Sequence, residues 1–443
     1  MAIEVRAVGG FGEVGKNMLA VRVDNEVVII DQGLHLPNYI SVTQGEDVLK
    51  LSPQQLINAQ AIPDDTMIAD WRHMVRAIVP SHAHLDHIGA IPYLASKYDC
   101  PVIASPFTMT VLKTILEDER IRISNRLVFC PLNGTVKLTN DISVQLVEIT
   151  HSTPQSTVVV IHTKYGAVVY SNDFKLDNNP IIGKRPNYQL LEKIGKDGVA
   201  LLLCECLYAQ AEGKTPSEAV AKQMLEDVMV HVNSKGKGMV VTTFSSHIAR
   251  LKSIIEFSRR INRKPVFLGR SLAKYSGAAQ ECGIYDFSKV EILKYPRQIQ
   301  ARLSDIARKR EKYVVVATGH QGEPNSVLHK ISHGKLKYRF NTEDHVVFSC
   351  KIIPSQINER NRSELEHDLH ESGVRIFKDI HVSGHAQRED LRDFIKLLKP
   401  QHVCPSHGEP KMMEAFSILG HDLGYELDEN LHPIKNGESL RLN

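Results

Sequence analysis

Short apolar runs alternate with amphipathic stretches along most of the chain, a pattern typical of α/β proteins. Residues 4–8 read as a strand, and residues 17–31 read as two strands joined by an Asp-Asn turn. Further strands are predicted at residues 101–104, 142–148 and 158–162. A helix is predicted at 107–117, whereas residues 38–75 carry no such periodicity and are predicted to form a polar loop.

The pattern changes after about residue 207. Helical periodicity dominates residues 216–232 and 247–260, and strand-like runs occupy residues 239–243 and 312–317. We therefore predict an inserted α/β unit at residues 208–358. The main domain would consist of a first part at residues 1–207 and a C-terminal part at residues 359–443.

The densest chemistry is the segment His82-Ala-His84-Leu-Asp86-His87, which directly follows an apolar run. Histidine and aspartate suit zinc-like divalent metals, and such a metal makes a bound water acidic enough to attack at neutral pH. In an extended segment, His82 and His84 point to the same side. Asp86 and His87 stand at the start of a predicted helix, so the turn can direct them at a second metal. A metal-free histidine-rich turn is the alternative.

Four later residues are further candidates for the same chemistry. His151 and Asp173 each follow a predicted strand, and His385 and His407 follow the inserted unit. A single histidine or aspartate after a strand is usually structural. Because these residues come in order behind the histidine-rich segment, His151 and Asp173 are interpreted as ligands.

The glycine-rich segment Gly10-Phe-Gly-Glu-Val-Gly15 matches the GxGxxG pattern of dinucleotide-binding proteins. That fold requires a helix directly after the glycines, and residues 17–31 read as strands instead. We therefore reject a dinucleotide site and place this loop beside the metal ligands.

Composition narrows the class of protein. The chain of 443 residues is 42% hydrophobic and 24% charged, with a net charge of +3, so nucleic-acid binding cannot be inferred from charge. Seven cysteines without a CxxC pair favour reduced thiols over a disulfide framework. No apolar stretch has the length of a membrane span, and the first residues lack the apolar core of a signal peptide. A cytoplasmic enzyme without membrane contact is expected.

The ordered series of candidate residues resembles the metallo-β-lactamase superfamily, and within it the β-CASP nucleases. The series consists of the HxHxDH segment at residues 82–87, then His151, Asp173, Glu205, His385 and His407. The segments Gly9–Asn17, Thr318–Pro324 and Ser383–Ala386 are similar to those of the ribonuclease J family. Because the chain ends at Asn443, it resembles the compact archaeal form. The resemblance implies a metallo-β-lactamase αββα sandwich with an inserted α/β β-CASP domain.

The resemblance also implies two divalent metal ions, with Zn²⁺ expected first and Mn²⁺ or Mg²⁺ as alternatives in activity. One ion would be held by His82, His84 and His151, and the other by Asp86, His87 and His407, with Asp173 bridging them.

The resemblance implies catalytic roles for Asp86, Asp173, His385 and Glu205. His385 would donate a proton to the departing 3′ oxygen or hold the phosphate. Glu205 would orient a late histidine, with His407 expected first.

Two segments are candidates for contacts with RNA phosphates. In Ser383-Gly384-His385-Ala386, a serine N-cap is one reading and a helix N-terminus that receives a 5′-phosphate is another. Ser246 and His247 would add phosphate contacts, or else form a serine N-cap beside a surface histidine.

Three positions depart from the family pattern. Asn172 stands where glycine is frequent, Glu205 where bacterial members often have aspartate, and His320 where serine is common. None of these removes a ligand, but they bear on the fine geometry and hence on the preference for one RNA end.

The resulting functional hypothesis is a 5′-to-3′ exoribonuclease that prefers 5′-monophosphorylated single-stranded RNA and acts in RNA decay and processing, with some endonuclease activity. An inserted domain over a metal face makes a channel suited to single-stranded nucleic acid. The alternatives are an RNA 3′-end-processing endoribonuclease, a small-molecule metallo-hydrolase and an inactive RNA-binding subunit. Family analogy adds a homodimer and RNA-decay partner proteins as expectations.

Overall fold

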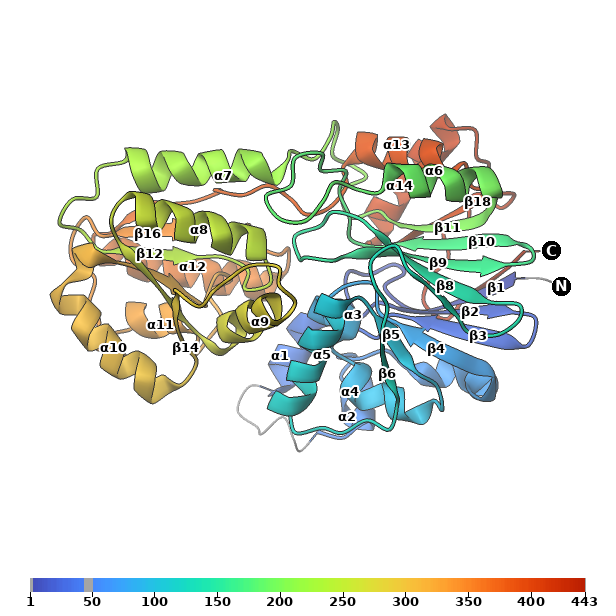
Figure 1. Cartoon of the computed structure of the whole chain (residues 1–443), viewed down its shortest axis with the longest axis horizontal. Helices are drawn as coiled ribbons and strands as arrows, with labels where there is room; N and C mark the ends of the chain where they lie inside the picture. The colour runs from blue at the N-terminus through green and yellow to red at the C-terminus, as the bar shows by residue number, and fades with distance from the viewer. Residues whose placement is uncertain (1–2, 44–50, 443) are drawn as a thin grey trace. The chain divides into compact units, whose positions relative to one another are not determined.

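The computed structural model describes residues 3–43 and 51–442, which fold into two compact units (Figure 1). The first unit comprises Met1–Asn178, Lys184–Thr215 and Gly384–Asn443. The inserted unit comprises Asn179–Gly183 and Pro216–Ser383. Each unit has its own sheets and its own hydrophobic core, so each is described separately.

The first unit contains two sheets whose inner faces share one hydrophobic core. The first sheet has the order β19 (Ser439–Leu442), β1 (Ile3–Gly9), β2 (Met18–Val23), β3 (Glu26–Ile30), β4 (Val75–Val79), β5 (Val102–Ala104), β6 (Leu127–Phe129). The second has the order β18 (His402–Ser406), β11 (Val199–Glu205), β10 (Gly166–Ser171), β9 (Thr157–Thr163), β8 (Ser143–Glu148), β7 (Thr135–Lys137). Fully buried Val21, Val79, Val144 and Ile161 meet between the sheets. Burial of each such side chain stabilises the fold by about 1.5–3 kcal/mol.

Helices cover the outer face of each sheet. In the first unit, α5 (Pro106–Asp118) packs on β5 and β6, and the short helices α3 (Leu85–Ile88) and α4 (Ile91–Leu94) follow β4. On the second sheet, α6 (Tyr188–Asp197), α13 (Arg388–Leu398) and α14 (Pro410–Asp422) supply apolar side chains to a second core. The order helix, sheet, sheet, helix confirms the predicted αββα sandwich.

The N-terminal strands agree with the sequence predictions. The turn between β2 and β3 falls at Asp24, whose φ of 52° is the left-handed conformation that aspartate tolerates. The glycine-rich loop after β1 leads into β2 and not into a helix, as expected once the dinucleotide site was rejected.

The prediction that residues 38–75 form a loop is wrong for the part that the structure describes, residues 38–43 and 51–75. Three short helices lie in or across this region: α1 (Leu36–Thr43), α2 (Pro53–Asn58) and the 3₁₀ segment η2 (Asp65–Met74). Helix α2 begins with a capping box, in which the Ser52 side chain accepts from Gln55 N and the Gln55 side chain accepts from Ser52 N. Residues 44–50 lie outside the described part of the chain.

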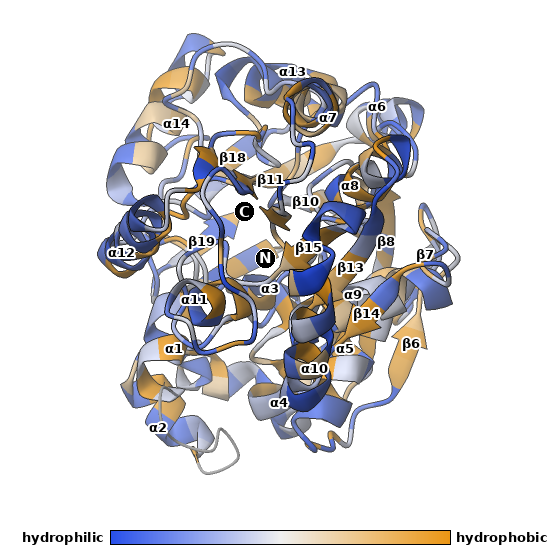
Figure 2. Cartoon of the chain, turned by 90° about the vertical axis from the view of Figure 1, so that its left-hand side faces the viewer, coloured by the Kyte–Doolittle hydropathy of each residue, from blue (hydrophilic) through white to orange (hydrophobic). Residues whose placement is uncertain are grey.

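The inserted unit is built on a parallel sheet, as its alternating strands and helices predict. Its order is β14 (Glu291–Leu293), β13 (Lys264–Leu268), β15 (Tyr313–Ala317), β12 (Met239–Thr242), β16 (His345–Phe348), β17 (Arg375–Phe377). The helices of this unit are α7 (Glu218–Glu226), α8 (Ile248–Arg260), α9 (Arg270–Glu281), α10 (Pro296–Arg308), α11 (Val327–Ser332) and α12 (Gln356–Glu371). Figure 2 shows α12 as largely hydrophilic, and it buries only three of its side chains.

The compact units meet at Thr215/Pro216 and Ser383/Gly384, and both points lie after the predicted domain boundaries at 207/208 and 358/359. The second difference has a simple cause. Strand β17 pairs with β16 of the parallel sheet, and α12 contributes Leu365 and Leu369 to its core. None of the described helices could cross a membrane.

The inserted unit contains a buried ion pair between Arg250 of α8 and Glu218 of α7. Arg250 Nε and Nη2 lie 2.7 and 2.9 Å from the two Glu218 carboxylate oxygens, and Arg250 Nη1 donates to Ser349 O and Ile380 O. Burial alone would raise the pKa of Glu218, but His247 and Arg250 hold it well below its usual value. The pair therefore stabilises the unit above the ordinary pKa of glutamate, and this stabilisation is lost only as the pH falls through the lower folded pKa.

We expect Glu218→Gln to lower the free energy of unfolding of the inserted unit by about 3–5 kcal/mol, because it leaves the Arg250 guanidinium buried without a counter-charge. Hydrogen exchange read by mass spectrometry, segment by segment, measures the change. The control is Glu226→Gln, whose ion pair with Arg260 is partly exposed and should contribute less than about 1 kcal/mol. Equal effects of the two variants would contradict the prediction.

Candidate metal centre

Three strands of the first unit end in site residues with a left-handed backbone. Asp31 follows β3 with a φ of 57°, Asp173 follows β10 with 57°, and His407 follows β18 with 50°. Such values are uncommon for residues other than glycine, and they gather at functional sites where the surrounding structure holds them. The sharp turn after each strand brings these side chains to one place.

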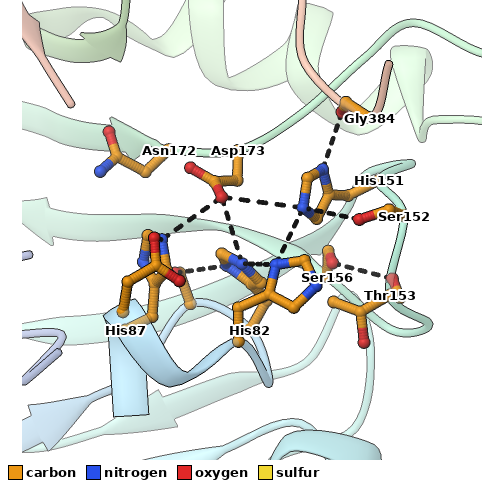
Figure 3. Close-up of polar contacts among 12 residues, drawn as sticks. His82, His87, His151, Ser152, Thr153, Ser156, Asn172, Asp173 and Gly384 are labelled. Carbon is orange, nitrogen blue, oxygen red and sulfur yellow. Dashed lines mark hydrogen bonds and ion pairs between the residues drawn. The ribbon is translucent and has the colours of Figure 1, made fainter. Parts of the chain in front are cut away.

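The first cluster contains His82, His84, His151 and Asp173. His84 Nδ1 lies 3.1 Å from His82 Nε2 and 3.2 Å from His151 Nε2. Asp173 Oδ2 lies 3.4 Å from His82 Nε2 and 3.7 Å from His151 Nε2, as Figure 3 shows with dashed lines. Ligands of a tetrahedral zinc at about 2.0–2.1 Å are separated by about 3.3 Å. The spacing of these four atoms therefore fits one tetrahedral ion.

The second cluster contains Asp86, His87, Asp173 and His407. His87 Nε2 lies 3.6 Å from Asp86 Oδ2 and 3.4 Å from Asp173 Oδ2. His407 Nε2 lies 3.4 Å from Asp173 Oδ1. Asp173 belongs to both clusters, so the structure brings all seven predicted ligands together around one carboxylate.

The donor set fits divalent metal ions on an observation independent of the spacing. Asp173 is 2% exposed, and its Oδ1 is buried without a hydrogen bond. A buried carboxylate oxygen without a partner is costly unless an ion or water satisfies it. Imidazole and carboxylate ligands suit zinc and related divalent ions. The site is therefore suited to divalent metals, whose identity is not fixed by these residues.

The electrostatics of the cluster favour neutral imidazoles on one side and a charged carboxylate at the centre. Burial holds the pKa of His84 and that of His151 well below the ordinary value, so both offer a lone pair. Burial alone would raise the pKa of Asp173, but the positive charges of His407, His87 and His385 hold it well below the usual range. Burial would lower the pKa of His87, yet the carboxylates of Asp173, Asp31 and Asp86 raise it well above normal.

Asp31 is a functional residue that the sequence analysis missed. It is fully buried, and its Oδ2 accepts from Tyr170 OH at 3.0 Å and lies 2.7 Å from His87 Nδ1, while its Oδ1 accepts from Ser81 N. Asp31 thus orients His87 with Nε2 toward Asp173, as carboxylates do for metal-binding imidazoles. A charged residue directly after the apolar run Val27–Ile30 was the available signal.

The prediction that Glu205 orients His407 is wrong. Glu205 Oε2 lies 2.7 Å from His385 Nδ1, and Glu205 Oε1 accepts from Phe174 N at 2.7 Å. His407 Nδ1 instead lies 2.8 Å from Oδ1 of Asn17, the last residue of the glycine-rich loop. Burial would lower the pKa of His385, but Glu205 and Asp173 raise it to about 9.

His385 stands beside the metal ligands. Its ring centroid lies 5.1 Å from that of His151, and Asp173, Glu205 and His385 form a third group of potential ligand atoms. Since Nδ1 faces Glu205, Nε2 is the nitrogen left for a substrate. This geometry is compatible with either predicted role, proton donation or phosphate binding, and both stay predictions.

The segment before α13 is arranged differently from the predicted N-terminus. The helix begins at Arg388 with Gln387 as its N-cap, so the reading of Ser383 as N-cap is wrong. The amide of Ala386 faces Glu205 and that of Gln387 donates to Thr215 Oγ1, so neither is presented to a phosphate. The cause is the longer loop that carries His385 past the metal ligands before the helix starts. A phosphate pocket at residues 383–386 stays a prediction.

Gly384 is placed by its contact with His151. Its carbonyl oxygen lies 2.7 Å from His151 Nδ1, which leaves His151 Nε2 to face Asp173 (Figure 3). A Cβ at Gly384 would lie 2.9 Å from His151 Cε1, closer than such atoms approach. Glycine at this position therefore allows the backbone to orient the imidazole.

Ser246 and His247 belong to the inserted unit. His247 is the N-cap of α8, and it is 3% exposed with its Nε2 3.3 Å from Glu218 Oε2. The alternative reading of a serine cap beside a surface histidine is therefore wrong, because the buried Glu218 draws the imidazole inward. Phosphate contacts by Ser246 and His247 stay a prediction.

Comparison with known protein families agrees with this architecture. Residues 72–195 match the metallo-β-lactamase superfamily, residues 236–364 match the ribonuclease J β-CASP domain, and residues 374–429 match a Zn-dependent metallo-hydrolase RNA specificity domain. The crystal structure of a protein of unknown function from Enterococcus faecalis V583 superposes with a TM-score of 0.67 at 16% identity, covering 100% of both chains. That likeness concerns the fold alone. The chain is thus a metallo-β-lactamase-fold protein with a β-CASP insertion.

Full-length relatives narrow the class further. The chain is 42% identical to ribonuclease J of Methanocaldococcus jannaschii, covering 99% of both chains. It is 40% identical to ribonuclease J of Pyrococcus abyssi, covering 99% of this chain and 97% of that one. Ribonuclease J of Sinorhizobium meliloti is 30% identical, with 98% of this chain and 73% of that one covered. The chain belongs to the ribonuclease J family, and its full-length match is to the archaeal members, as predicted.

Proposed function

We propose that this protein is a metal-dependent ribonuclease that degrades single-stranded RNA from the 5′ end and prefers a 5′-monophosphate. The observation that carries the proposal is the convergence of seven ligand-type side chains on the Asp173 carboxylate. The relatives named ribonuclease J and the match to an RNA specificity domain support RNA as the substrate. The 5′-to-3′ direction rests on the family resemblance, as do action in RNA decay and processing, a homodimer and RNA-decay partner proteins.

We assign His82, His84 and His151 to one ion, Asp86, His87 and His407 to the other, and Asp173 to both. Zinc is the expected ion, because three imidazoles and a carboxylate within tetrahedral spacing suit it, and manganese or magnesium are alternatives in activity. Ions held there supply Lewis-acid chemistry for phosphodiester hydrolysis.

The other side chains of the centre have positioning and proton-transfer roles in this proposal. Asp31 holds His87, and the Gly384 carbonyl holds His151, so each presents Nε2 toward Asp173. Glu205 stabilises a proton on His385, which donates it from Nε2 to the departing 3′ oxygen. Residues Ser383 to Ala386, together with Ser246 and His247, are proposed to contact RNA phosphates.

The test uses a single-stranded RNA carrying a 5′-³²P-monophosphate, beside a triphosphorylated copy of the same sequence. Protein loaded with zinc or with manganese is incubated with each substrate. Labelled mononucleotide at the earliest times, formed faster from the monophosphate, is the expected result.

Other outcomes would replace the proposal. Discrete longer labelled fragments would indicate an endoribonuclease of the same family, such as one that processes RNA 3′ ends. No cleavage by protein with metals bound would favour a small-molecule metallo-hydrolase, and no bound metal would favour an inactive RNA-binding subunit.

A further inference from the structure

Asn172 precedes the bridging Asp173 and is one of the positions at which this chain departs from the family pattern. It is 2% exposed, and both ends of its side-chain amide have partners (Figure 3 shows its place beside Asp173). Its Oδ1 accepts from Ser406 Oγ at 2.7 Å, and its Nδ2 donates to Asn17 Oδ1 at 3.2 Å. Asn17 and Ser406 are each 1% exposed, so the chain of contacts is shielded from water.

These contacts connect three separate segments to one metal ligand. Asn172 follows β10, Ser406 ends β18, and Asn17 closes the glycine-rich loop. Strand β11 lies between β10 and β18, so the contact between Asn172 and Ser406 passes over the end of a strand. Asn17 Oδ1 also lies 2.8 Å from Nδ1 of His407, the residue after Ser406.

The direction of each hydrogen bond is set by the one before it. Ser406 donates its hydroxyl proton to Asn172, so the Asn172 oxygen faces Ser406 and its NH₂ faces Asn17. Asn17 must then present its oxygen, since two NH₂ groups cannot bond to each other. An oxygen facing His407 Nδ1 requires a proton on Nδ1, which leaves the lone pair on Nε2, the nitrogen 3.4 Å from Asp173 Oδ1.

The other histidines with Nε2 toward the centre are oriented in simpler ways. A carboxylate holds His87 through Asp31, and a backbone carbonyl holds His151 through Gly384. Neither acceptor can reverse its role, because a carboxylate or a carbonyl only accepts. A carboxamide can present either end, so the orientation of Asn17 has to be fixed by something else.

We propose that Asn172 is a positioning residue that fixes the orientation of Asn17, and through it the tautomer of His407, and so sets the affinity of the metal site formed by Asp86, His87 and His407. The inference rests on the proposed function for the identity of that site as a metal site. A glycine at position 172 would leave the Ser406 hydroxyl and the Asn17 carboxamide without this link.

The decisive variant is Asn172→Asp, which keeps the shape of the side chain and removes its donor. Two oxygens would then face each other, so Asn17 is expected to turn its NH₂ toward position 172. That rotation brings the Asn17 NH₂ toward His407 Nδ1 or breaks the contact, and the proton moves to His407 Nε2. The added negative charge acts in the opposite direction, because by attraction alone it would strengthen metal binding.

Two measurements test this. In metal-free protein, ¹⁵N NMR of the histidine side chains reports which nitrogen of His407 carries the proton, with the His407 signals identified by their loss in His407→Ala. We expect Nδ1–H in the natural protein and a shift toward Nε2–H in Asn172→Asp. Chelator competition should show that the second metal binds about 10- to 100-fold more weakly in the variant, while the site of His82, His84 and His151 changes less.

Ser406→Ala provides a milder test if Asn172→Asp folds poorly, because it frees the Asn172 carboxamide to turn and should weaken the second metal by a smaller factor. The control is Asn125→Asp, a buried asparagine that donates to Tyr98 O and Cys100 O away from the site. Asn125→Asp should lower stability and leave the His407 tautomer and both metal affinities unchanged.

An unchanged His407 tautomer together with unchanged or tighter binding of the second metal in Asn172→Asp would overturn the inference. The NMR measurement needs neither metal nor RNA, so it distinguishes this inference from the proposed function. If the natural protein binds two ions but leaves RNA intact, the proposed function fails while the tautomer and affinity shifts still support the role of Asn172.

Discussion

Asp173→Ala is expected to abolish RNA cleavage, with a rate at least about a thousandfold lower, while RNA binding survives. Asp173 is the one side chain shared by both metal clusters, and its two oxygens lie within 3.7 Å of four imidazoles. Without it, both ions lose a ligand and the buried imidazoles lose their counter-charge. A thousandfold loss corresponds to about 4 kcal/mol of activation free energy, within the range of metal-ion catalysis.

Single-turnover cleavage, fluorescence anisotropy with labelled RNA and metal analysis of the purified variant would measure the three consequences. The control is Asp65→Asn, which removes another buried carboxylate, paired with Lys97 and Tyr98 outside the metal centre. This control should lose stability but keep its metals and its cleavage rate. Turnover retained in Asp173→Ala would rule out the two-metal assignment.

The ligands could be predicted because their positions depend on local geometry. Spacing within an extended segment and the turn into α3 are properties of a few residues, so the two pairs in the segment His82–His87 separate into the two clusters as expected. Histidine and aspartate at strand ends are likewise visible in the sequence. The resemblance then added the late histidines, which no local pattern connects to the others.

The partners of those ligands could not be predicted, because they depend on how distant strands align. Glu205 ends β11, and its register against β18 and the path of the segment Gly384–Ala386 decide that it meets His385 and not His407. Asn17 reaches His407 because the glycine-rich loop lies against residues 407 and 408, where Phe11 forms an isolated bridge with Gly408. The short helices between residues 36 and 74 were missed because only Leu56, Asp65, Ile68 and Trp71 are buried there, too few to show a helical period.

The second large effect is expected at His385. Replacement by alanine should reduce cleavage about 10²- to 10⁴-fold, the usual contribution of a general acid. Glu205 holds Nδ1 and raises the pKa of His385 to about 9, so the imidazole carries a proton on Nε2 at neutral pH. The Tyr208 ring, with its centroid 5.9 Å away, and the ring of His151 confine the imidazole on two sides.

A modified substrate separates the two roles proposed for His385. When sulfur replaces the departing 3′ oxygen, the leaving group is a thiolate, which needs no proton to depart. If His385 acts as the acid, His385→Ala should lose most of its defect on such an RNA. An equal defect on both substrates would assign His385 to phosphate binding instead.

Glu205→Gln tests how the pair works, since glutamine keeps an acceptor for Nδ1 but removes the negative charge. We expect a smaller loss than in His385→Ala, with the same relief by the sulfur substrate, because the proton on His385 is held less strongly without the carboxylate. Glu205 also accepts from Phe174 N, next to Asp173, so metal analysis must accompany the rates. Loss of metal in Glu205→Gln without relief by sulfur would show that Glu205 acts by supporting Asp173 and not through His385.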